Sequence, residues 1–494
     1  MNYNSKMVTS NMFWRFLERF GAQGVTLIVS IVLARILDPV VYGTVALITV
    51  ITTILQVFVD GGFGTALVQK KDSDNVDFST VFYFNFIVCV VLYFILFFIA
   101  PLVASFYETD EMAGLIRVLG LVLIISGFKN IQNAYASKHL LFKKYFFATL
   151  GGTIVAAIVG IWMAYNGYGV WALVVQNVVN QAIDTVILWL LVKWRPQLVF
   201  SWKKLKVLFA FGWKLLLSAL IDTTWNELRT LIIGKKYTKD DLAFYNKGME
   251  YPKYATTAIN SSVDSVLLPV MSSEQEDLGR VKAICRRSIK TSSFILWPAM
   301  IGLAACSKSF ISVILTDKWL PSEPYLIIFC IVYAFYPIHT ANLNAIKAVG
   351  RSDIFLILEI LKKMFSLVIV LITMWFGVWW LAIGCLIDCV LGQVINAWPN
   401  KKLLNYSYIE QLKDIFPVLL LSAFMGVIVY LVNYINLSSV LTLIIQVSIG
   451  MIVYIAGAYI FKFESLFYCL RLVGNYFHKN MKNVTIEEKN QKNV

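Results

Sequence analysis

Long apolar stretches separated by short polar breaks follow one another along almost the whole of this 494-residue chain. A bilayer core is about 30 Å thick, so a helix that crosses it needs roughly 20 mostly apolar residues. Fourteen stretches approach or exceed this length. They span about residues 11–36, 41–66, 79–106, 113–137, 145–166, 169–193, 207–234, 241–270, 291–316, 322–346, 353–375, 378–398, 413–434 and 438–461. The sequence therefore predicts an all-α polytopic membrane protein with fourteen transmembrane helices.

Composition supports this class, because 59% of the residues are hydrophobic and only 15% are charged. Such values lie outside the range of soluble globular proteins. Near the start, Arg15, Glu18 and Arg19 occupy the place where a signal peptide has its apolar region. We therefore expect no cleaved signal, so that the first helix stays in the protein. The tail after Lys462 is short, basic and polar, and we expect it to form a surface helix.

The orientation follows from the distribution of lysine and arginine among the loops, since cytoplasmic loops carry an excess of both. The even-numbered loops hold 19 and the odd-numbered loops hold 4. The even-loop residues are Lys70, Lys71, Lys138, Lys143, Lys144, Lys193, Arg195, Lys203, Lys204, Lys206, Arg280, Lys282, Arg286, Arg287, Lys290, Lys347, Arg351, Lys401 and Lys402, and the odd-loop residues are Lys235, Lys236, Lys239 and Lys318. This alternation predicts that both termini lie in the cytoplasm. It also explains the net charge of +14 by anchoring at the inner leaflet, without a nucleic-acid partner.

A short loop occurs twice, as YGVWALVVQ from Tyr168 and as FGVWWLAIG from Phe376. The two copies precede the sixth and the twelfth predicted helix, so the repeat period is six helices. An even offset keeps the direction through the membrane, which predicts two parallel six-helix bundles related by an axis near the membrane normal. We expect an N-terminal bundle over 1–200, a C-terminal bundle over 201–405, two extra helices over 406–465, and a cytoplasmic tail over 466–494.

Polar residues follow one face of the first two helices of each predicted bundle at helical spacing, which predicts a hydrated cavity walled by these four helices. Charged residues on or near these faces give our candidate cavity or ion-coupling residues: Glu18, Asp60, Asp222, Glu250 and Asp264. By topology, further cations lie in the cytoplasmic half, where they would attract a phosphate or an acidic sugar. The substrate-binding candidates are Arg15, Arg19, Lys129, Lys214 and Lys347 in this half, together with Arg229 on the polar face of the seventh predicted helix. Plain pairing is the alternative, in which Arg15, Arg19 and Lys214 neutralise Glu18, Asp60 and Asp264.

The segments LARILDPVVYGTVALI, FVDGGFGTALVQKKD and DFSTVFYFN resemble the start of polysaccharide flippases of the Wzx and teichuronic-acid-exporter type. These belong to the multidrug/oligosaccharidyl-lipid/polysaccharide exporter superfamily. The resemblance covers about 460 residues and implies two six-helix bundles in a V-shaped arrangement plus two extra helices. It also implies a polyprenyl-pyrophosphate-linked oligosaccharide as the substrate, moved from the cytoplasmic to the periplasmic leaflet by alternating access.

Two other functions stay open. A drug or small-cation antiporter of the same superfamily would use Asp60, Asp222 and Asp264 to couple transport to H⁺ or Na⁺. A membrane scaffold would recruit glycosyltransferases without transport, although such a protein has little need of polar stripes through the bilayer. The three histidines, including His339, have no nucleophile or metal partner in the sequence, so we expect neither an enzyme nor a metal site or cofactor.

Overall fold

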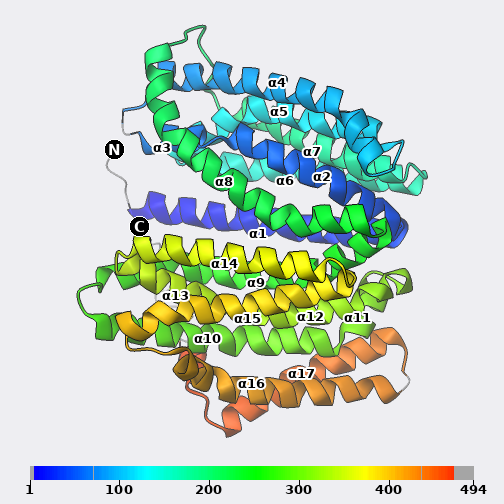
Figure 1. Ribbon diagram of the computed structural model, residues 1–494, viewed down its shortest axis with the longest axis vertical. Helices are drawn as coiled ribbons and strands as arrows, with labels where there is room; N and C mark the ends of the chain where they lie inside the picture. The colour runs from blue at the N-terminus through cyan, green and yellow to red at the C-terminus, as the bar shows by residue number, and fades with distance from the viewer. Residues whose placement is uncertain (1–4, 71, 436, 472–494) are drawn as a thin grey trace, which may run out of the picture. The chain divides into compact units, whose positions relative to one another are not determined.

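The computed structural model describes residues 5–70, 72–435 and 437–471; the side chains of residues 5–13, 15–20, 22, 211, 261, 262, 265 and 352 are not described. These described residues form α-helices, short 3₁₀ turns and loops, with no β-strand among them (Figure 1). The all-α prediction is confirmed. The chain divides into two compact units, Met1–Ala243 and Phe244–Val494, and each is considered by itself. The division into 1–200, 201–405, 406–465 and 466–494 rests on the repeat and stays a prediction.

The first unit contains eight α-helices and the start of a ninth. They are α1 (Ser5–Ile36), α2 (Pro39–Asp60), α3 (Phe63–Gln69), α4 (Asn75–Phe106), α5 (Met112–Lys138), α6 (Phe142–Tyr165), α7 (Val170–Leu191) and α8 (Trp202–Lys236), and α9 (Lys239–Ser273) begins at the end of this unit. Helix α6 packs along α7 and α1, α4 packs along α5, and α2 packs against α8. Aromatic contacts secure the α1 to α6 contact, with the rings of Trp14 and Phe146 centred 5.6 Å apart.

The second unit consists of the rest of α9 and the helices after it. They are α10 (Leu278–Ala305), α11 (Ser307–Ile314), η1 (Asp317–Ser322), α12 (Glu323–Ala334), α13 (Tyr336–Ala348), α14 (Ser352–Thr373), α15 (Val378–Leu403), α16 (Tyr408–Leu431), η2 (Val432–Ile435) and α17 (Ser439–Ile460). Helix α10 is the centre of this unit, because it packs against α16, α12 and α13. The bend from α10 to α11 is 75°.

Helices occupy all fourteen stretches for which the sequence predicts spans, but not all of them meet a strict test for membrane crossing. Among the described residues, nine helices are long and apolar enough, or ten if the bent pair α10 and α11 forms one span. The count of fourteen spans therefore stays a prediction. Helices α8, α9 and α14 do not meet the test, and α1 contributes only a shorter apolar stretch, Gln23–Ile36. The last eighteen residues of α14, for example, include three charged side chains, Glu359, Lys362 and Lys363. Charged residues inside a span normally face protein or water rather than lipid.

The repeated loop has the same structural role in both copies. Gly169 and Gly377 each stand at the N-cap, directly before α7 and α15, with φ of 51° and 117°. Only glycine adopts positive φ of this kind without steric strain, because it lacks a Cβ. The duplication seen in the sequence is therefore also a duplication of a helix start.

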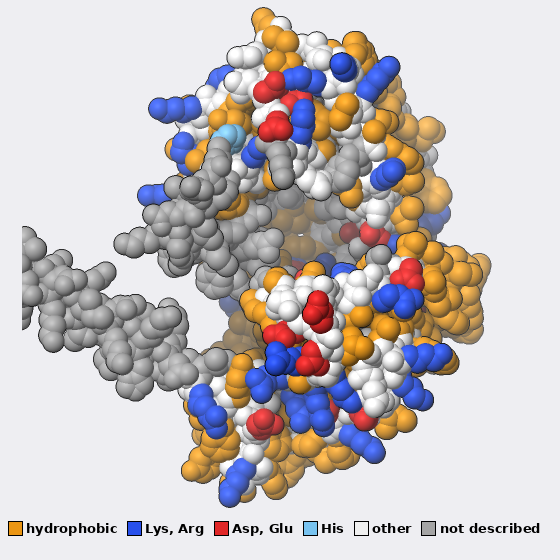
Figure 2. Space-filling model, turned by 90° about the vertical axis from the view of Figure 1, so that its left-hand side faces the viewer, with side chains coloured by type: hydrophobic (Ala, Val, Ile, Leu, Met, Phe, Trp, Pro, Cys, Tyr) orange, Lys and Arg blue, Asp and Glu red, His pale blue; other side chains and the backbone are white. Residues whose placement is uncertain are grey.

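Loops that the sequence assigns to the same side of the membrane meet in the structure. In the first unit Lys138 and Lys204 reach the loop that joins α3 to α4, and in the second unit Arg286 of α10 pairs with Asp414 of α16. At the opposite end of the first unit, Lys235 pairs with Glu108 at 3.3 Å. Figure 2 views the helix ends at which the even-numbered loops lie, and lysine and arginine side chains gather there on each unit. This arrangement is that of helices running alternately up and down.

Candidate functional site

A polar cavity of 310 Å³ lies between α9 and α13 of the second unit. It is lined by Thr256, Thr257, Asn260 and Asp264 of α9 and by Tyr336, His339, Thr340, Leu343, Asn344 and Lys347 of α13. Two of the predicted site residues, Asp264 and Lys347, therefore lie in the same cavity. Helix α13 begins directly after α12, with a Pro in its first turn. Polar residues on one face of α13 line the cavity together with those of α9.

The carboxylate in this cavity is held by one amide. Asn344 Nδ2 donates to Asp264 Oδ1 at 2.5 Å, and Asn344 is 3% exposed whereas Asp264 is exposed. The Lys347 ammonium lies 4.5 Å from the ring centre of Phe355 and is also exposed. The cavity thus combines one accessible carboxylate, one accessible cation and several hydroxyl and amide groups. A set of this kind can hydrogen-bond sugar hydroxyls and attract a phosphate.

His339 lines the cavity and is also hydrogen-bonded. Its Nδ1 lies 2.7 Å from Nδ2 of Asn396 on α15. The amide N–H of Asn396 donates this hydrogen bond, and Nδ1 of the ring accepts it. His339 therefore both lines the cavity and is held by a hydrogen bond from α15.

Behind the cavity, three buried amide side chains tie α13 to α15 and α16. Asn342 donates to Gln411 at 2.7 Å, and Asn400 donates to Asn342 at 2.7 Å. All three side chains have an exposed fraction of 0%. A buried network of amide hydrogen bonds fixes side-chain positions, because a shift would break these bonds and leave further buried polar atoms unpaired; Asn400 Oδ1 already has no partner among the described residues. The polar face of α13 therefore stands on a rigid support.

In the first unit, the predicted substrate cation Lys129 is engaged in an ion pair. Its Nζ lies 2.5 Å from Asp184 Oδ2 of α7 and 3.4 Å from Gln181 Oε1. The side chains of Lys129 and Asp184 are 12% and 7% exposed, and Gln181 donates in turn to Ser126 at 2.8 Å. This geometry fits structural pairing, although the partner is Asp184 rather than any carboxylate that the sequence suggested.

The other predicted site residues lie on several helices. Lys214 and Asp222 are exposed on α8, Arg229 is half-buried on the same helix, and Asp60 is exposed at the end of α2. Glu250 pairs with the buried Lys247 at 2.7 Å. The side chains of Arg15, Glu18 and Arg19 lie outside the described residues. The predicted cavity walled by helices of both bundles stays a prediction.

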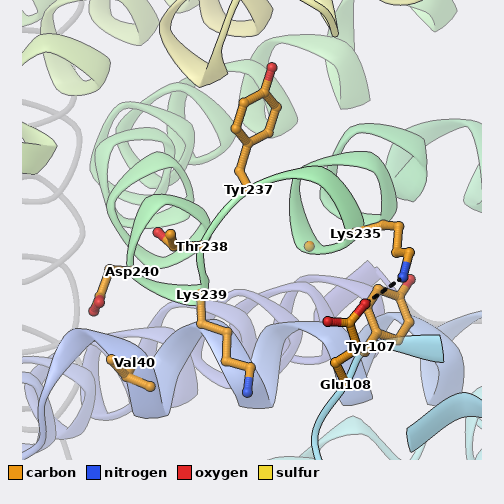
Figure 3. Close-up of a pocket in the computed structure, with 9 residues that line it drawn as sticks. Val40, Tyr107, Glu108, Lys235, Tyr237, Thr238, Lys239 and Asp240 are labelled. Atoms are coloured by element: carbon orange, nitrogen blue, oxygen red, sulfur yellow. Dashed lines mark hydrogen bonds and ion pairs between the residues drawn. The ribbon is translucent and has the colours of Figure 1, made fainter. Parts of the chain in front are cut away.

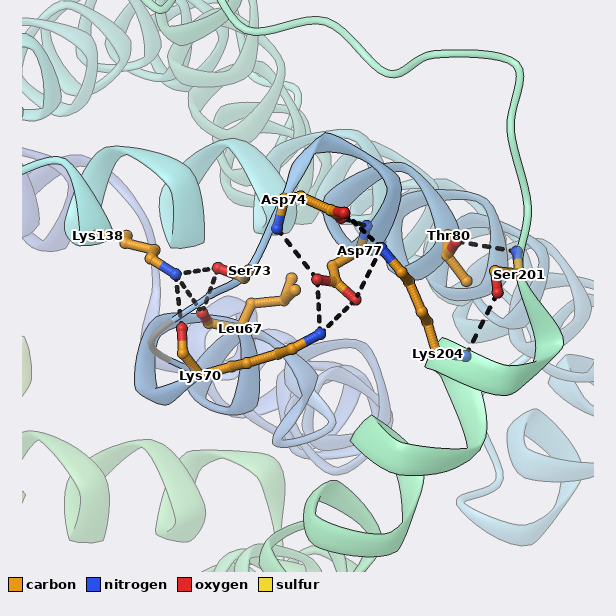
Figure 4. Close-up of polar contacts among 9 residues, drawn as sticks. All are labelled: Leu67, Lys70, Ser73, Asp74, Asp77, Thr80, Lys138, Ser201 and Lys204. Atoms are coloured by element: carbon orange, nitrogen blue, oxygen red, sulfur yellow. Dashed lines mark hydrogen bonds and ion pairs between the residues drawn. The ribbon is translucent and has the colours of Figure 1, made fainter.

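A second polar cluster forms at the even-loop end of the first unit, from the motif DGGFGTALVQKKD and the segment after it (Figure 4). Lys70 donates to both oxygens of Asp77, at 2.8 and 2.7 Å, and Asp77 is fully buried. Lys204 of α8 lies 2.5 Å from Asp74, while Lys138 of α5 donates to Ser73 and to the backbone oxygen of Lys70. The motif therefore joins α3, α4, α5 and α8.

Local chemistry builds this cluster. Asp74 and Asp77 form a reciprocal capping box at the start of α4, which satisfies two backbone N–H groups. The Lys204 ammonium, which donates a hydrogen bond to Asp74, lowers the pKa of that carboxyl to about 2. Gly62 turns the chain from α2 to α3 with φ of 68°, and a Cβ there would lie 2.6 Å from the backbone oxygen of Gly212 on α8. The motif is accounted for by packing and capping.

At the odd-loop end of the first unit, another cavity of 310 Å³ is lined by Tyr107 and Glu108 and by the α8 to α9 turn (Figure 3). Lys235 donates to the backbone oxygen of Phe106 at 2.6 Å and pairs with Glu108. The side chains of Tyr237 and Asp240 point in different directions rather than toward a common point. This hollow is a weaker candidate site than the one between α9 and α13.

Several of these residues were missed by sequence reasoning. Asp184, Asn396 and Asn400 were not singled out, because a lone polar residue in an apolar helix carries no sign of its partner. Asn342 and Asn344 lie in the segment ANLNAIKAVG, which echoes NIQNAYASKHL in polar pattern. That echo marked the position, but it did not reveal that Asn344 meets Asp264. Among the residues that the structure describes, no three His, Cys, Asp or Glu side chains form a metal-binding group.

Comparison with known proteins assigns the chain to a family. A family model described as "Polysaccharide biosynthesis protein" matches residues 32–324. The chain belongs to this family. Related members include the teichuronic acid biosynthesis protein TuaB of Bacillus subtilis, 26% identical over 61% of this chain, and the succinoglycan biosynthesis transport protein ExoT of Rhizobium meliloti, 23% identical over 65%. The chain spans 63% and 65% of the lengths of these two relatives. A third, the lipopolysaccharide biosynthesis protein WzxC of Escherichia coli, is 22% identical, and the match covers 76% of each chain.

The fold of this family member is shared with solved transporters. The lipid II flippase MurJ, in an inward closed conformation, matches with a TM-score of 0.75 at 17% identity over 90% of this chain and 98% of its own. An inward-facing multidrug resistance MATE family transporter of the MOP superfamily matches with a TM-score of 0.57 at 15% identity, over 78% of this chain and 95% of its own. Family and fold confirm the resemblance that the sequence indicated, and the chain is an integral membrane protein.

Proposed function

We propose that this protein is a flippase that carries a polyprenyl-pyrophosphate-linked oligosaccharide across the bacterial cytoplasmic membrane during the synthesis of a surface polysaccharide. The observation that carries the proposal is the cavity between α9 and α13. It presents Asp264, Asn344 and Lys347, and the last two belong to α13, which is part of the candidate membrane span Asp317–Ala348. A soluble sugar head group needs hydrogen-bonding partners along its path, because it loses water when it enters the hydrocarbon.

The names of the relatives support the substrate class, since they refer to teichuronic acid, succinoglycan and lipopolysaccharide. In our proposal, hydroxyl and amide groups such as Thr257, Asn260 and Asn344 hydrogen-bond the glycan, and Lys347 attracts the pyrophosphate. Asp264 accepts hydrogen bonds from sugar hydroxyls. The protein holds and releases its cargo by alternating access without forming a covalent bond to it.

The proposal includes an orientation and a bundle arrangement. Both termini lie in the cytoplasm, because the loops on that side are rich in lysine and arginine. Residues 1–200 and 201–405 act as the two parallel bundles that alternate, and 406–465 add two helices. Glycosyltransferases or a polymerase are the proposed protein partners, since they would supply or consume the lipid-linked glycan.

The decisive experiment reconstitutes the purified protein in vesicles with a fluorescent polyprenyl-linked oligosaccharide and measures its exchange between leaflets. We expect exchange by the unaltered protein and a loss of most of it in Asp264→Asn and in Asn344→Ala. The matched control is Glu274→Gln, a carboxylate-to-amide change at a loop residue that pairs with Arg280. Absence of exchange by the unaltered protein, or full exchange in both cavity variants, would contradict the proposal.

The antiporter alternative keeps one supporting observation, the accessible Asp264 carboxylate within the predicted span 241–270. The same vesicles distinguish it when an H⁺ or Na⁺ gradient is applied. Uptake of a cationic dye that depends on the gradient and on Asp264, without glycan exchange, would favour the antiporter. Pull-down of glycosyltransferases without any exchange would favour the scaffold.

A further inference from the structure

A basic cavity of 680 Å³ lies where α10 and the segment after α17 come together, away from the cavity of α9 and α13. Arg286, Arg287 and Lys290 reach it from α10, and Lys462 and Arg471 reach it from the end of the described chain. Residues 464–471 are helical, as the sequence indicated for the tail. The proposed transport function uses none of these side chains.

The charges in and around this cavity do not cancel. Glu464 is the one acidic residue in its lining, and Asp414 of α16 approaches from outside, 2.6 Å from Arg286 and 3.5 Å from Lys290. Five cations face two carboxylates, so the net charge is +3. Several cations at one concave place attract an anion, and arginine binds phosphate oxygens through parallel hydrogen bonds.

The surroundings place this cavity at the surface of the membrane. Helix α17 is a candidate span that ends at Ile460, only two residues before Lys462. The last apolar side chains, Ile460 and Phe461, are each 69% exposed, and Leu470 is 55% exposed. Apolar side chains so close to a set of cations provide the two contacts that a phospholipid makes, with its acyl chains and with its head group.

The helix 464–471 is held against the two spans by aromatic contacts. The ring of Phe467 lies 6.2 Å from that of Tyr459 on α17, and Phe463 lies 6.3 Å from Phe294 on α10. Arg287 lies 5.5 Å from the ring centre of Tyr468. These contacts hold the helix 464–471 beside α10, so that cations of both line one cavity.

We propose that this cavity binds the head group of an anionic phospholipid, such as phosphatidylglycerol, and anchors the end of α17 to the bilayer. The phosphodiester group of the lipid is held between Arg287, Lys462 and Arg471. A free phosphate ion has the same oxygens but no acyl chains, so it makes none of the apolar contacts at Ile460 and Phe461. The lipid is therefore the favoured source of the phosphate.

The test uses the full-length protein in detergent with equal amounts of phosphatidylglycerol and phosphatidylcholine, and native mass spectrometry counts the lipid that each molecule retains. The variant carries Arg287→Gln, Lys462→Gln and Arg471→Gln, which leaves the pairs with Asp414 intact. The matched control carries Lys193→Gln, Lys203→Gln and Lys206→Gln, three exposed lysines of an even-numbered loop. A third protein, with Arg287→Lys, Lys462→Arg and Arg471→Lys, keeps the charge.

We expect the unaltered, control and charge-keeping proteins to retain phosphatidylglycerol in preference to phosphatidylcholine. Each cation near a membrane surface contributes roughly fivefold in affinity, so the triple glutamine variant should bind the anionic lipid about 100-fold more weakly. An equal loss in the control would show a general charge effect and overturn the proposal. So would displacement of the lipid by millimolar inorganic phosphate, because the cavity would then be a site for the free ion.

Discussion

The ion pair between Lys129 and Asp184 offers the sharpest test of whether a cation inside the first unit binds cargo or holds helices together. With charge centres roughly 4 Å apart, the attraction is about 4 kcal/mol at an effective dielectric constant of about 20. The desolvation of both groups offsets much of this gain. The structure puts the two side chains at 12% and 7% exposed, so each would be left in a nearly dry site without its partner.

Removal of one partner from a buried pair costs about 3–5 kcal/mol, whereas replacement of both is often close to neutral. We expect Lys129→Met and Asp184→Asn each to lower the free energy of unfolding by about 3 kcal/mol, at the lower end of that range. Two effects reduce the loss: Gln181 remains near the side chain that is left, and an isolated carboxylate or ammonium can lose its charge. The double variant should lose less stability than either single one, which corresponds to a coupling of about 3 kcal/mol or more.

The assay is unfolding of the purified protein by denaturant in detergent, followed by tryptophan fluorescence, with Lys193→Met as the exposed-lysine control. Leaflet exchange is measured on the unaltered protein, the two single variants, the double variant and the control. Additive losses in the double variant would refute the pairing argument. Full stability with lost exchange in Lys129→Met would refute it as well, and would return Lys129 to the set of cargo-binding residues.

Three further predictions concern the cluster at the start of α4. Lys70→Met should lower the free energy of unfolding by about 2 kcal/mol in the same titration, because Asp77 is fully buried and Lys204, at 3.9 Å, is the cation that remains beside it; no loss would contradict this. Gly62→Ala should lower it by more than 2 kcal/mol, since a Cβ would meet the α8 backbone at 2.6 Å and φ is positive, and unaltered stability would exclude the clash. Because the hydrogen bond from Lys204 lowers the pKa of Asp74 to about 2, the ionised carboxyl stabilises the protein at pH values above the ordinary carboxyl pKa range. This stabilisation is lost as the pH falls through about 2. At pH 6, Asp74→Asn should therefore be less stable than the unaltered protein by a small amount that depends on salt. The difference should vanish near pH 2. A constant difference across that pH range would contradict this prediction.

The sequence predicted the helices well because a bilayer imposes a length and a composition on each of them. All fourteen stretches are helical, and the alternation of basic loops agrees with the contacts among Lys138, Lys204 and the α3 to α4 loop. The apolarity of a segment was a poorer predictor of a membrane span in helices such as α9, whose charged residues form ion pairs or line a cavity. A hydropathy average cannot tell a charge that faces lipid from one that faces protein.

Partners across helices could not be predicted, even where the residue type was noticed. Asp264 and Lys347 were singled out and lie in one cavity, yet the amide that holds Asp264 was not. Lys129 was taken for a cargo-binding cation, and only the packing of α5 against α7 brings Asp184 to it. Helical spacing gives the face on which a residue stands, but not the helix opposite that face.

The sequence by itself determined the class of protein, the positions of the helices, the repeat of the loop before α7 and α15, and the resemblance to the polysaccharide biosynthesis family. Each of these can be read from the order of residues along the chain, without knowing which segments pack together. Only the tertiary structure decided which charges are paired, which remain accessible beside α13, and where cations from α10 and from the tail share one cavity. Those outcomes depend on contacts between segments more than 50 residues apart, as from Lys129 to Asp184. Such contacts are fixed by packing, which no single segment specifies.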